Sequence, residues 1–177
     1  IAMLMAILMP ALGRVKRLAA RLVCGTNLRG LGTACLIYAQ ENDEEFPVQG
    51  GPGADVWASI DSQTQYWDWT DSDVDWSGVQ DMTISASQYL LVRNADVSPK
   101  VFVCKSSGAK PFEGMDSAGN EPQDTQTEIV ELYDFGDQPR LHVSYSYHYP
   151  YIAGDGSTAY PLSGMSSPGM AIMADKN

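Results

Sequence analysis

The sequence predicts an α+β protein in which a long N-terminal α-helix packs against a small, mainly antiparallel β-sheet head. Three observations lead to this prediction. Apolar residues recur at spacings of three and four between Ala11 and Tyr38, as on one face of a helix. Residues 141–149 alternate between apolar and polar side chains, as in a strand with one buried face. The charge changes sign near residue 40, where we place the boundary between a helical stalk (1–40) and an acidic head (41–177).

The two parts carry opposite charge. Residues 1–40 contain five basic residues and no acidic one, whereas residues 41–177 contain six basic residues and all 22 acidic residues of the chain. An acidic head of this size argues against nucleic-acid binding, because affinity for phosphate backbones comes from Lys and Arg placed against them. The apolar run that precedes the basic stretch points to a membrane or a partner helix instead. A chain of 177 residues with 44% apolar content can also form a substantial core.

The first twelve residues, Ile1–Leu12, contain no charged or hydrogen-bonding side chain. As a helix they rise about 18 Å, against about 30 Å of bilayer hydrocarbon, so this run alone cannot span a membrane. It is either the end of a longer apolar helix or a buried core helix. The basic residues follow the run, whereas those of a secretory signal peptide precede it. Pro10 together with Gly13 predicts a kink or an unwound stretch.

From Val15 the pattern is helical and continues to Ala39 or Gln40. One face, which we expect to pack against the head, carries five residues at spacings of four and three: Cys24, Leu28, Leu31, Cys35 and Tyr38. A second run precedes it at the same spacings: Ala11, Val15, Leu18 and Leu22. Glycines at positions 13, 25, 30 and 32 are unfavourable in a helix interior, and so predict close helix approach or a local loosening.

The helix should end at the acidic run 41–45, which is followed by a Gly/Pro loop at 50–53. In the head we expect one short helix from Ser85 or Ser87 through about Ala95. Short strands are expected at residues 101–104, 128–135 and 170–173, in addition to the clearest one at 141–149. That strand places His142 and His148 about 20 Å apart, too far to share a metal ion. Without a third convergent group they support no hydrolase triad, and we expect no enzymatic activity.

Residues 54–80 are rich in tryptophan and aspartate and should form a loop. Asp71, Asp73 and Asp75 have the opening spacing of a calcium loop, in which oxygen ligands at alternate positions surround the cation. Trp76 stands where that loop needs Gly, and Met82 where it needs Glu. A solvated acidic loop is therefore favoured, with a non-standard calcium site as the alternative; no other cofactor motif is present. The segment's four tryptophans could stack on a carbohydrate, or pack on their own domain or a neighbouring subunit: Trp57, Trp67, Trp69 and Trp76.

The three cysteines allow at most one intramolecular disulfide. Cys24 and Cys35 share a helix face, but eleven residues of helix separate them by about 16 Å, whereas bridged Cα atoms lie within about 7 Å. They cannot pair with each other. Cys104 is the only possible intramolecular partner for either, and such a bond would tie the head to the helix. The alternative is three buried thiols.

Several segments carry a family resemblance. They are the run Ile1–Arg14, the stretch Cys24–Tyr38, the pairs Asn42-Asp43 and Phe46-Pro47, and in the head Pro99–Cys104 and Ser144–Tyr147. Together they resemble type IV pilin-like proteins, in particular a bacterial branch with a prepilin-type N-terminal segment that is related to type II secretion pseudopilins. The resemblance is strong over residues 1–47, patchy to residue 150 and weak in the Trp/Asp loop.

The resemblance implies a structural subunit of an extracellular type IV pilus-like filament. Such subunits wait in the inner membrane through the apolar helix, and pilus or type II secretion machinery then extracts them into a homopolymer. Their helices bundle in the core and their heads form the outside. The residues that would form the filament core here are Ile1, Met3, Leu4, Met5, Ile7, Leu8, Met9, Pro10 and Leu12.

The resemblance also bears on single positions. It implies that Cys24 is the partner of Cys104, because the family more often has a cysteine there, with Cys35 as the alternative. Pro10 would match the family's helix-kinking proline. The family's mature N-terminus lies before Ile1, and its C-terminal part usually continues past residues 174–177, so we expect the sequence to be incomplete at both ends. The competing functions are a type II secretion pseudopilin and a helix-anchored surface module whose Trp/Asp loop binds a glycan or calcium.

Overall fold

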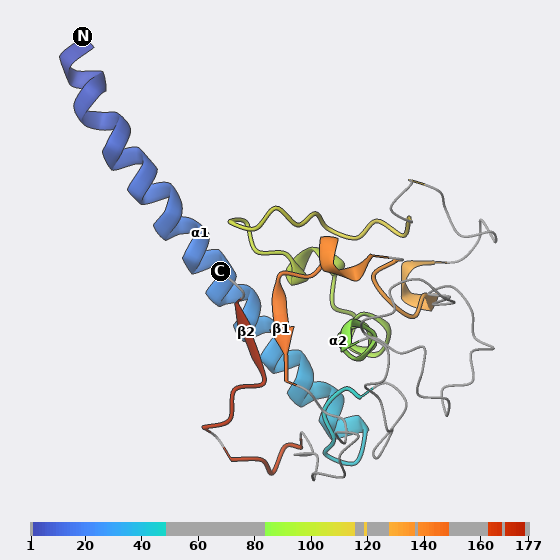
Figure 1. Cartoon of the computed structure of the whole chain (residues 1–177). Coiled ribbons are helices and arrows are strands. Elements are labelled where there is room, and N and C mark those ends of the chain that lie inside the picture. The colour runs from blue at the N-terminus through green and yellow to red at the C-terminus, as the bar shows by residue number, and fades with distance from the viewer. Residues whose placement is uncertain are drawn as a thin grey trace, which may run out of the picture.

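The structure is a computed structural model that describes residues 2–48, 84–115, 119, 128–136, 138–148, 163–167 and 169–175, with the backbone alone at 2–8, 11 and 84. The described residues form two α-helices, α1 (Ala2–Glu41) and α2 (Ile84–Asn94). These are followed by three 3-10 helices, η1 (Pro99–Phe102), η2 (Ile129–Glu131) and η3 (Pro139–Leu141), and by strands β1 (Tyr145–Tyr147) and β2 (Met173–Asp175). The described part thus has a long N-terminal helix and a small two-stranded antiparallel sheet. The N-terminal part of α1 projects from the head (Figure 1).

Helix α1 is continuous, and the unwound stretch expected at Pro10 is absent because the helix runs through it. A proline removes one backbone hydrogen bond, and the Ala, Leu and Met residues around it favour helix strongly enough to continue. The helix ends one or two residues after the expected boundary, where Asp43 and Glu44 adopt left-handed backbone conformations with φ of 50° and 65°. The Glu44 N–H donates to Ala39 O at 2.8 Å, as in a left-handed C-terminal cap.

The helix glycines make no close packing contact with the described residues of the chain. A Cβ atom built at Gly13, Gly25, Gly30 or Gly32 would meet no atom within 4 Å among the described residues. The close helix approach that these glycines predict is therefore not made inside the described part of the molecule.

Aromatic rings form part of the core of the head. Phe135 is fully buried, and its ring centroid lies 4.8 Å from that of Tyr89 and 4.9 Å from that of Phe102, both in edge-to-face geometry. This is the arrangement that aromatic pairs prefer. Burying each such side chain contributes about 1.5–3 kcal/mol. The rings belong to the same buried cluster as the face of α1 that meets the head.

Two of the expected strands are 3-10 helices instead. Residues 101–104 lie in or just after η1, because Pro99 at its first turn has a fixed φ that favours a helical start. Residues 128–135 contain η2, which is closed by a capping box between Glu128 and Glu131. Both strand predictions are therefore wrong, and in both cases a local cap or proline decides the conformation.

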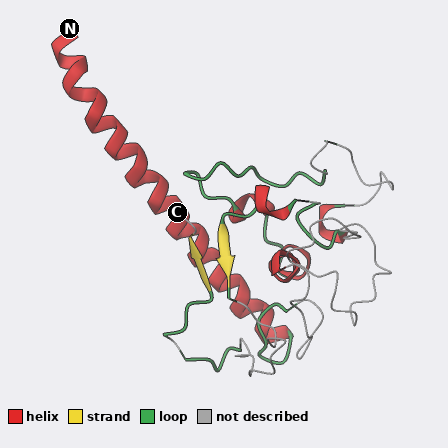
Figure 2. Ribbon diagram, viewed as in Figure 1, coloured by secondary structure: helices red, strands yellow, loops and turns green. Residues whose placement is uncertain are grey.

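The strand expected at 141–149 is real but shorter. Pro139 starts η3, which includes Leu141, so pairing is confined to Tyr145–Tyr147. Its partner is β2, which starts three residues later and ends two residues later than the predicted 170–173 and places Tyr147 opposite Met173. Figure 2 shows that loops make up much of the described head.

Val143, Tyr145 and Tyr147 are buried as the alternation predicts, but Ser144 is buried too. Its hydroxyl lies 2.6 Å from that of Ser107, and its N–H donates to Phe102 O. These two partners satisfy its polar groups away from solvent.

Candidate assembly surface on the N-terminal helix

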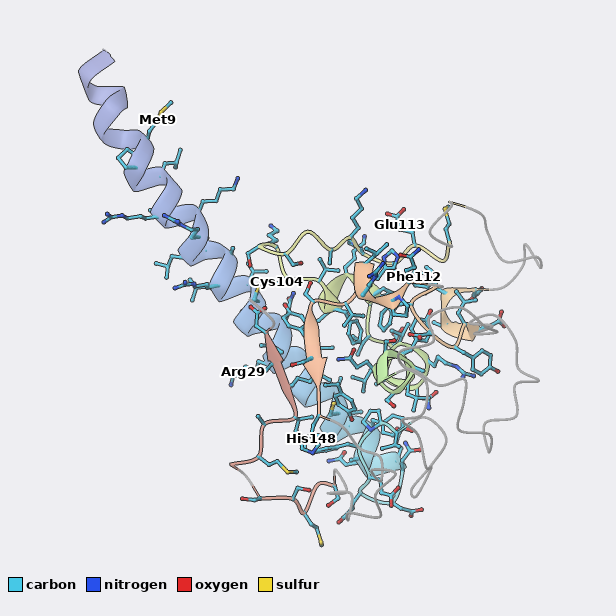
Figure 3. All side chains as sticks on the ribbon, viewed as in Figure 1. Met9, Arg29, Cys104, Phe112, Glu113 and His148 are labelled. Atoms are coloured by element: carbon cyan, nitrogen blue, oxygen red, sulfur yellow. A yellow bond between two sulfur atoms is a disulfide. The ribbon has the colours of Figure 1, made fainter. Side chains whose placement is uncertain are left out.

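The head is joined covalently to α1. Cys24 and Cys104 form a disulfide with a Cα–Cα distance of 5.2 Å, and Figure 3 shows Cys104 beside the helix. The alternative pairing of Cys35 with Cys104 does not form: Cys104 is bonded to Cys24, and Cys35 is a buried free thiol. Burial raises the pKa of that thiol from 9.0 to about 12, so it stays protonated and inert at neutral pH.

The face of α1 expected to meet the head does so. Cys24, Leu31, Cys35 and Tyr38 are buried, and Leu28 is partly buried against the same core. Asn27, which the periodicity did not single out, adds a polar link: its side-chain amide donates to Val103 O and to the Tyr145 hydroxyl.

The Tyr145 hydroxyl is part of this polar link. Burial raises its pKa, the hydrogen bond from Asn27 opposes that rise, and Asp175 reinforces it. The disulfide and the amide together fix the rotation of the helix relative to the head.

Between Met9 and Val23, the side chains of α1 that the structure describes are exposed, apart from a partly buried Ala20. Met9 is 75% exposed, Leu12 70% and Leu22 67%, and Pro10 is exposed as well. Figure 3 shows Met9 on the part of the helix that projects from the head. Exposed apolar surface of this extent usually marks an interaction site. Of the other predicted filament-core residues, Ile1 lies outside the described residues, and only the helical backbone is described for Met3, Leu4, Met5, Ile7 and Leu8.

A second row of side chains runs along α1 on the face opposite the head. We call it the free seam; its members are all exposed and are spaced by three and four residues: Val15, Leu18, Leu22, Thr26, Arg29, Thr33, Leu36 and Gln40. A repeat of 3.5 residues is the spacing with which one helix packs along another. Its first three members belong to the apolar run that the sequence predicted, whereas most of the later members are polar and are recognised only by their exposure on this face.

The two threonines of the free seam need no further polar partner. The Thr26 hydroxyl donates to Leu22 O and the Thr33 hydroxyl to Arg29 O, each at 3.0 Å. Each hydroxyl is therefore satisfied by the helix itself. The seam can accept an apolar neighbour at these positions.

One group of described side chains has the spacing of a metal site. The ligand atoms of Cys24, Cys104 and Asp175 lie within 4.8 Å of one another, with Asp175 Oδ2 3.7 Å from Cys104 Sγ. The two sulfurs are bonded to each other, so neither offers the thiolate that binds a metal. The group is a disulfide with a neighbouring carboxylate. His142 and His148 belong to no such group in the described part of the chain.

The remaining candidates from the sequence fall elsewhere. The possible calcium ligands Asp71, Asp73 and Asp75 lie outside the described residues, as does the tryptophan-rich segment around them, and calcium binding stays a prediction. Among the helices that the structure describes, none combines the length and the apolar character needed to cross a membrane. Comparison of the chain with protein-family models, curated proteins and solved structures found no match.

Proposed function

We propose that this chain is a structural, non-enzymatic subunit of an extracellular type IV pilus-like filament, assembled through its N-terminal helix. The observation that carries the proposal is the exposed part of α1 between Met9 and Val23. A monomeric soluble protein rarely keeps a row of side chains such as Met9, Leu12 and Leu22 in water. Burial of each in a polymer would contribute about 1.5–3 kcal/mol, repeated in every subunit.

The arrangement of head and helix supports the same function. The head covers one face of α1 between Cys24 and Tyr38, whereas the described side chains of the opposite face, and nearly all of those from Met9 to Val23, are exposed. In a filament, the exposed surface of α1 would contact a different surface on the next copy. An interface between two different surfaces that does not close into a ring generates a helical filament. Before assembly, the subunit would be held in the inner membrane and delivered to the pilus or type II secretion machinery, as the family resemblance implies.

The proposal is tested by electron cryomicroscopy of cells that produce the chain. We expect fibres whose repeating unit accommodates the head and a central bundle of α1 helices. Long surface fibres support a pilus-like role, short periplasmic assemblies would indicate a pseudopilin, and chains that remain single at the surface would indicate an anchored binding module. The absence of any fibre containing this chain refutes the proposal.

A matched pair of variants separates assembly from folding. Leu18→Glu with Leu22→Glu places two charges on the free seam, whereas Val130→Glu with Leu141→Glu places two charges at exposed apolar positions of the head. All four positions are exposed, so both variants should fold and form the disulfide. We expect the first variant to lose filaments and the second to keep them.

A further inference from the structure

The row of α1 that contacts the head continues toward the N-terminus as arginines. Counting back from Leu31, Leu28 and Cys24 in steps of three and four leads to Arg21, Arg17 and Arg14. These three, which we call the arginine row, are exposed, and none has an ion-pair partner among the described residues. The head covers this face of α1 at Cys24. On the N-terminal side of Cys24 the same face is exposed and basic.

The other end of α1 is acidic. The helix terminates in a turn that carries Glu41, Asp43, Glu44 and Glu45, which we call the acidic turn. Three of these side chains are exposed and Glu45 is half-buried. None has an ion-pair partner in the part of the chain that the structure describes. One helix thus presents four acids at one end and three arginines near the other.

The two charged groups cannot meet within one molecule. From Arg17 to Glu41 there are 24 residues of continuous helix, a rise of about 36 Å. Charges that far apart in water are screened from each other, since the Debye length is about 8 Å at physiological salt. Among the residues that the structure describes, no acidic group reaches the arginine row, and the acidic turn can reach it only in a second copy.

We infer that the arginine row of one copy binds the acidic turn of a second, parallel copy, which fixes the axial offset between neighbouring helices at about 36 Å. This inference rests on the filament proposed above and specifies its register. In the structure, α1 is the rigid spacer that sets the offset, because it is unbroken from the arginine row to the acidic turn.

Two arrangements of neighbouring helices, parallel and antiparallel, can pair the arginine row with the acidic turn. Only the parallel one can add copies indefinitely. In an antiparallel pair each arginine row would meet the partner's acidic turn, and the pair would close as a dimer with nothing left to bind. In the parallel arrangement each copy keeps one arginine row and one acidic turn for further copies. An interface that pairs different surfaces in this way extends into a fibre.

Charge reversal tests the contact. The variant with Arg14, Arg17 and Arg21 changed to Glu should lose filaments, measured as the sedimenting fraction and by negative-stain imaging. Adding Glu41→Lys, Glu44→Lys and Glu45→Lys to the same chain should restore them; Asp43 is left unchanged because its φ of 50° suits aspartate better than a long side chain. The matched control, with Lys100, Lys105 and Lys110 changed to Glu, makes the same change in net charge on exposed head positions and should polymerise normally.

Cross-linking tests the register. A chain carrying Arg17→Cys and Glu44→Cys should form a ladder of covalent oligomers under mild oxidation, because each copy can bond to two neighbours. Formation of dimers only, together with cross-linking of an Arg29→Cys chain to itself, would show the antiparallel pair and overturn the inference. Filaments that tolerate the arginine reversal, or that lack the ladder, also overturn it while leaving the filament proposal intact. Failure of the unmodified chain to form filaments refutes the filament proposal itself.

Discussion

Removal of the Cys24–Cys104 bond measures how strongly the head is held to α1. The perturbation is the double variant Cys24→Ala with Cys104→Ala, which avoids leaving an unpaired thiol. Both sulfurs are buried where the helix enters the head, and the variant keeps a small apolar group at each position. The change in stability therefore reports mainly on the loss of the covalent link.

The magnitude follows from the length of the loop that the bond closes. The two cysteines are 80 residues apart in sequence. In the chain-entropy model, a loop of this length lowers the entropy of the unfolded state by about 15 cal/mol/K, which is about 4.5 kcal/mol at room temperature. Single domains are typically stable by about 5–15 kcal/mol. Loss of the bond should thus remove a large part of the total stability of the head.

The assay is urea unfolding of the full chain in a mild non-ionic detergent, followed by the near-ultraviolet circular dichroism of the buried tyrosines. The control is Cys35→Ala, which removes a buried thiol that forms no bond and should cost about 1 kcal/mol. Hydrogen exchange provides a second readout: amides of residues 24–38 should lose more protection than those of α2.

A loss below about 2 kcal/mol, under the usual range for a native disulfide, or a loss no larger than that of the control, would refute the reasoning. Either result would mean that the unfolded chain is already restricted around these residues. The head would then be held to α1 by packing and hydrogen bonds, without a substantial contribution from the covalent bond.

Three further substitutions test the core, the polar link and an ionisation separately. Phe135→Ala should lower the free energy of unfolding by about 3–5 kcal/mol, because the buried ring contacts two others edge-to-face; Phe135→Leu should recover most of the loss in the same urea titration. Asn27→Ala should raise the pKa of Tyr145 further, since the amide hydrogen bond now lowers it; ultraviolet titration of tyrosinate absorbance measures this, and an unchanged value would contradict the link. Cys35 keeps its proton to about pH 12 when folded but has a reference pKa of 9.0, so its stabilising effect is complete below pH 9 and is lost above it. Between pH 8 and 10 it should account for about 1.4 kcal/mol of lost stability, and Cys35→Ala should lack that part of the pH dependence.

The helices follow closely from the sequence because their signals are local and long. The repeat from Cys24 to Tyr38 identified both α1 and its buried face. The short helix of the head was also predicted, but α2 begins at Ile84, so Ser85 and Ser87 lie inside it and neither is its N-cap; it ends one residue before Ala95. The end of α1 depends on the left-handed backbone at Asp43. The acidic composition of residues 41–45 predicted the boundary of the helix, but it did not predict the left-handed backbone that caps it.

The strands were predicted less well, because short apolar runs do not determine their own conformation. The apolar run Val101–Cys104 predicts a strand when it is considered alone. Pro99, two residues earlier, instead favours a helical start. The Glu128 and Glu131 spacing is a capping-box signal that was available in the sequence and outweighs the apolar residues between. The burial of Ser144 could not be predicted from the local sequence pattern, because its hydrogen-bond partner Ser107 comes from a distant part of the chain.

The candidate surface was predicted in part. The apolar start and the basic stretch were evident from composition, and the family resemblance gave them a role. The free seam past residue 22 was not recognised, because Thr26, Arg29 and Thr33 are not apolar and interrupt the hydrophobic pattern. Only their shared exposure on the face opposite the head identifies them as one row.

The position of the disulfide also has a mechanical consequence. Among the described side chains of α1, Cys24 is the first buried one counted from the N-terminus, so a pull on the projecting part of the helix would load the Cys24–Cys104 bond early. A helix held only by side-chain packing could be peeled away one turn at a time under tension. Here the force would pass through a covalent bond at the root of the helix and spread into the segment around Cys104. A fibre built from such subunits could be stretched without its heads being stripped from their helices.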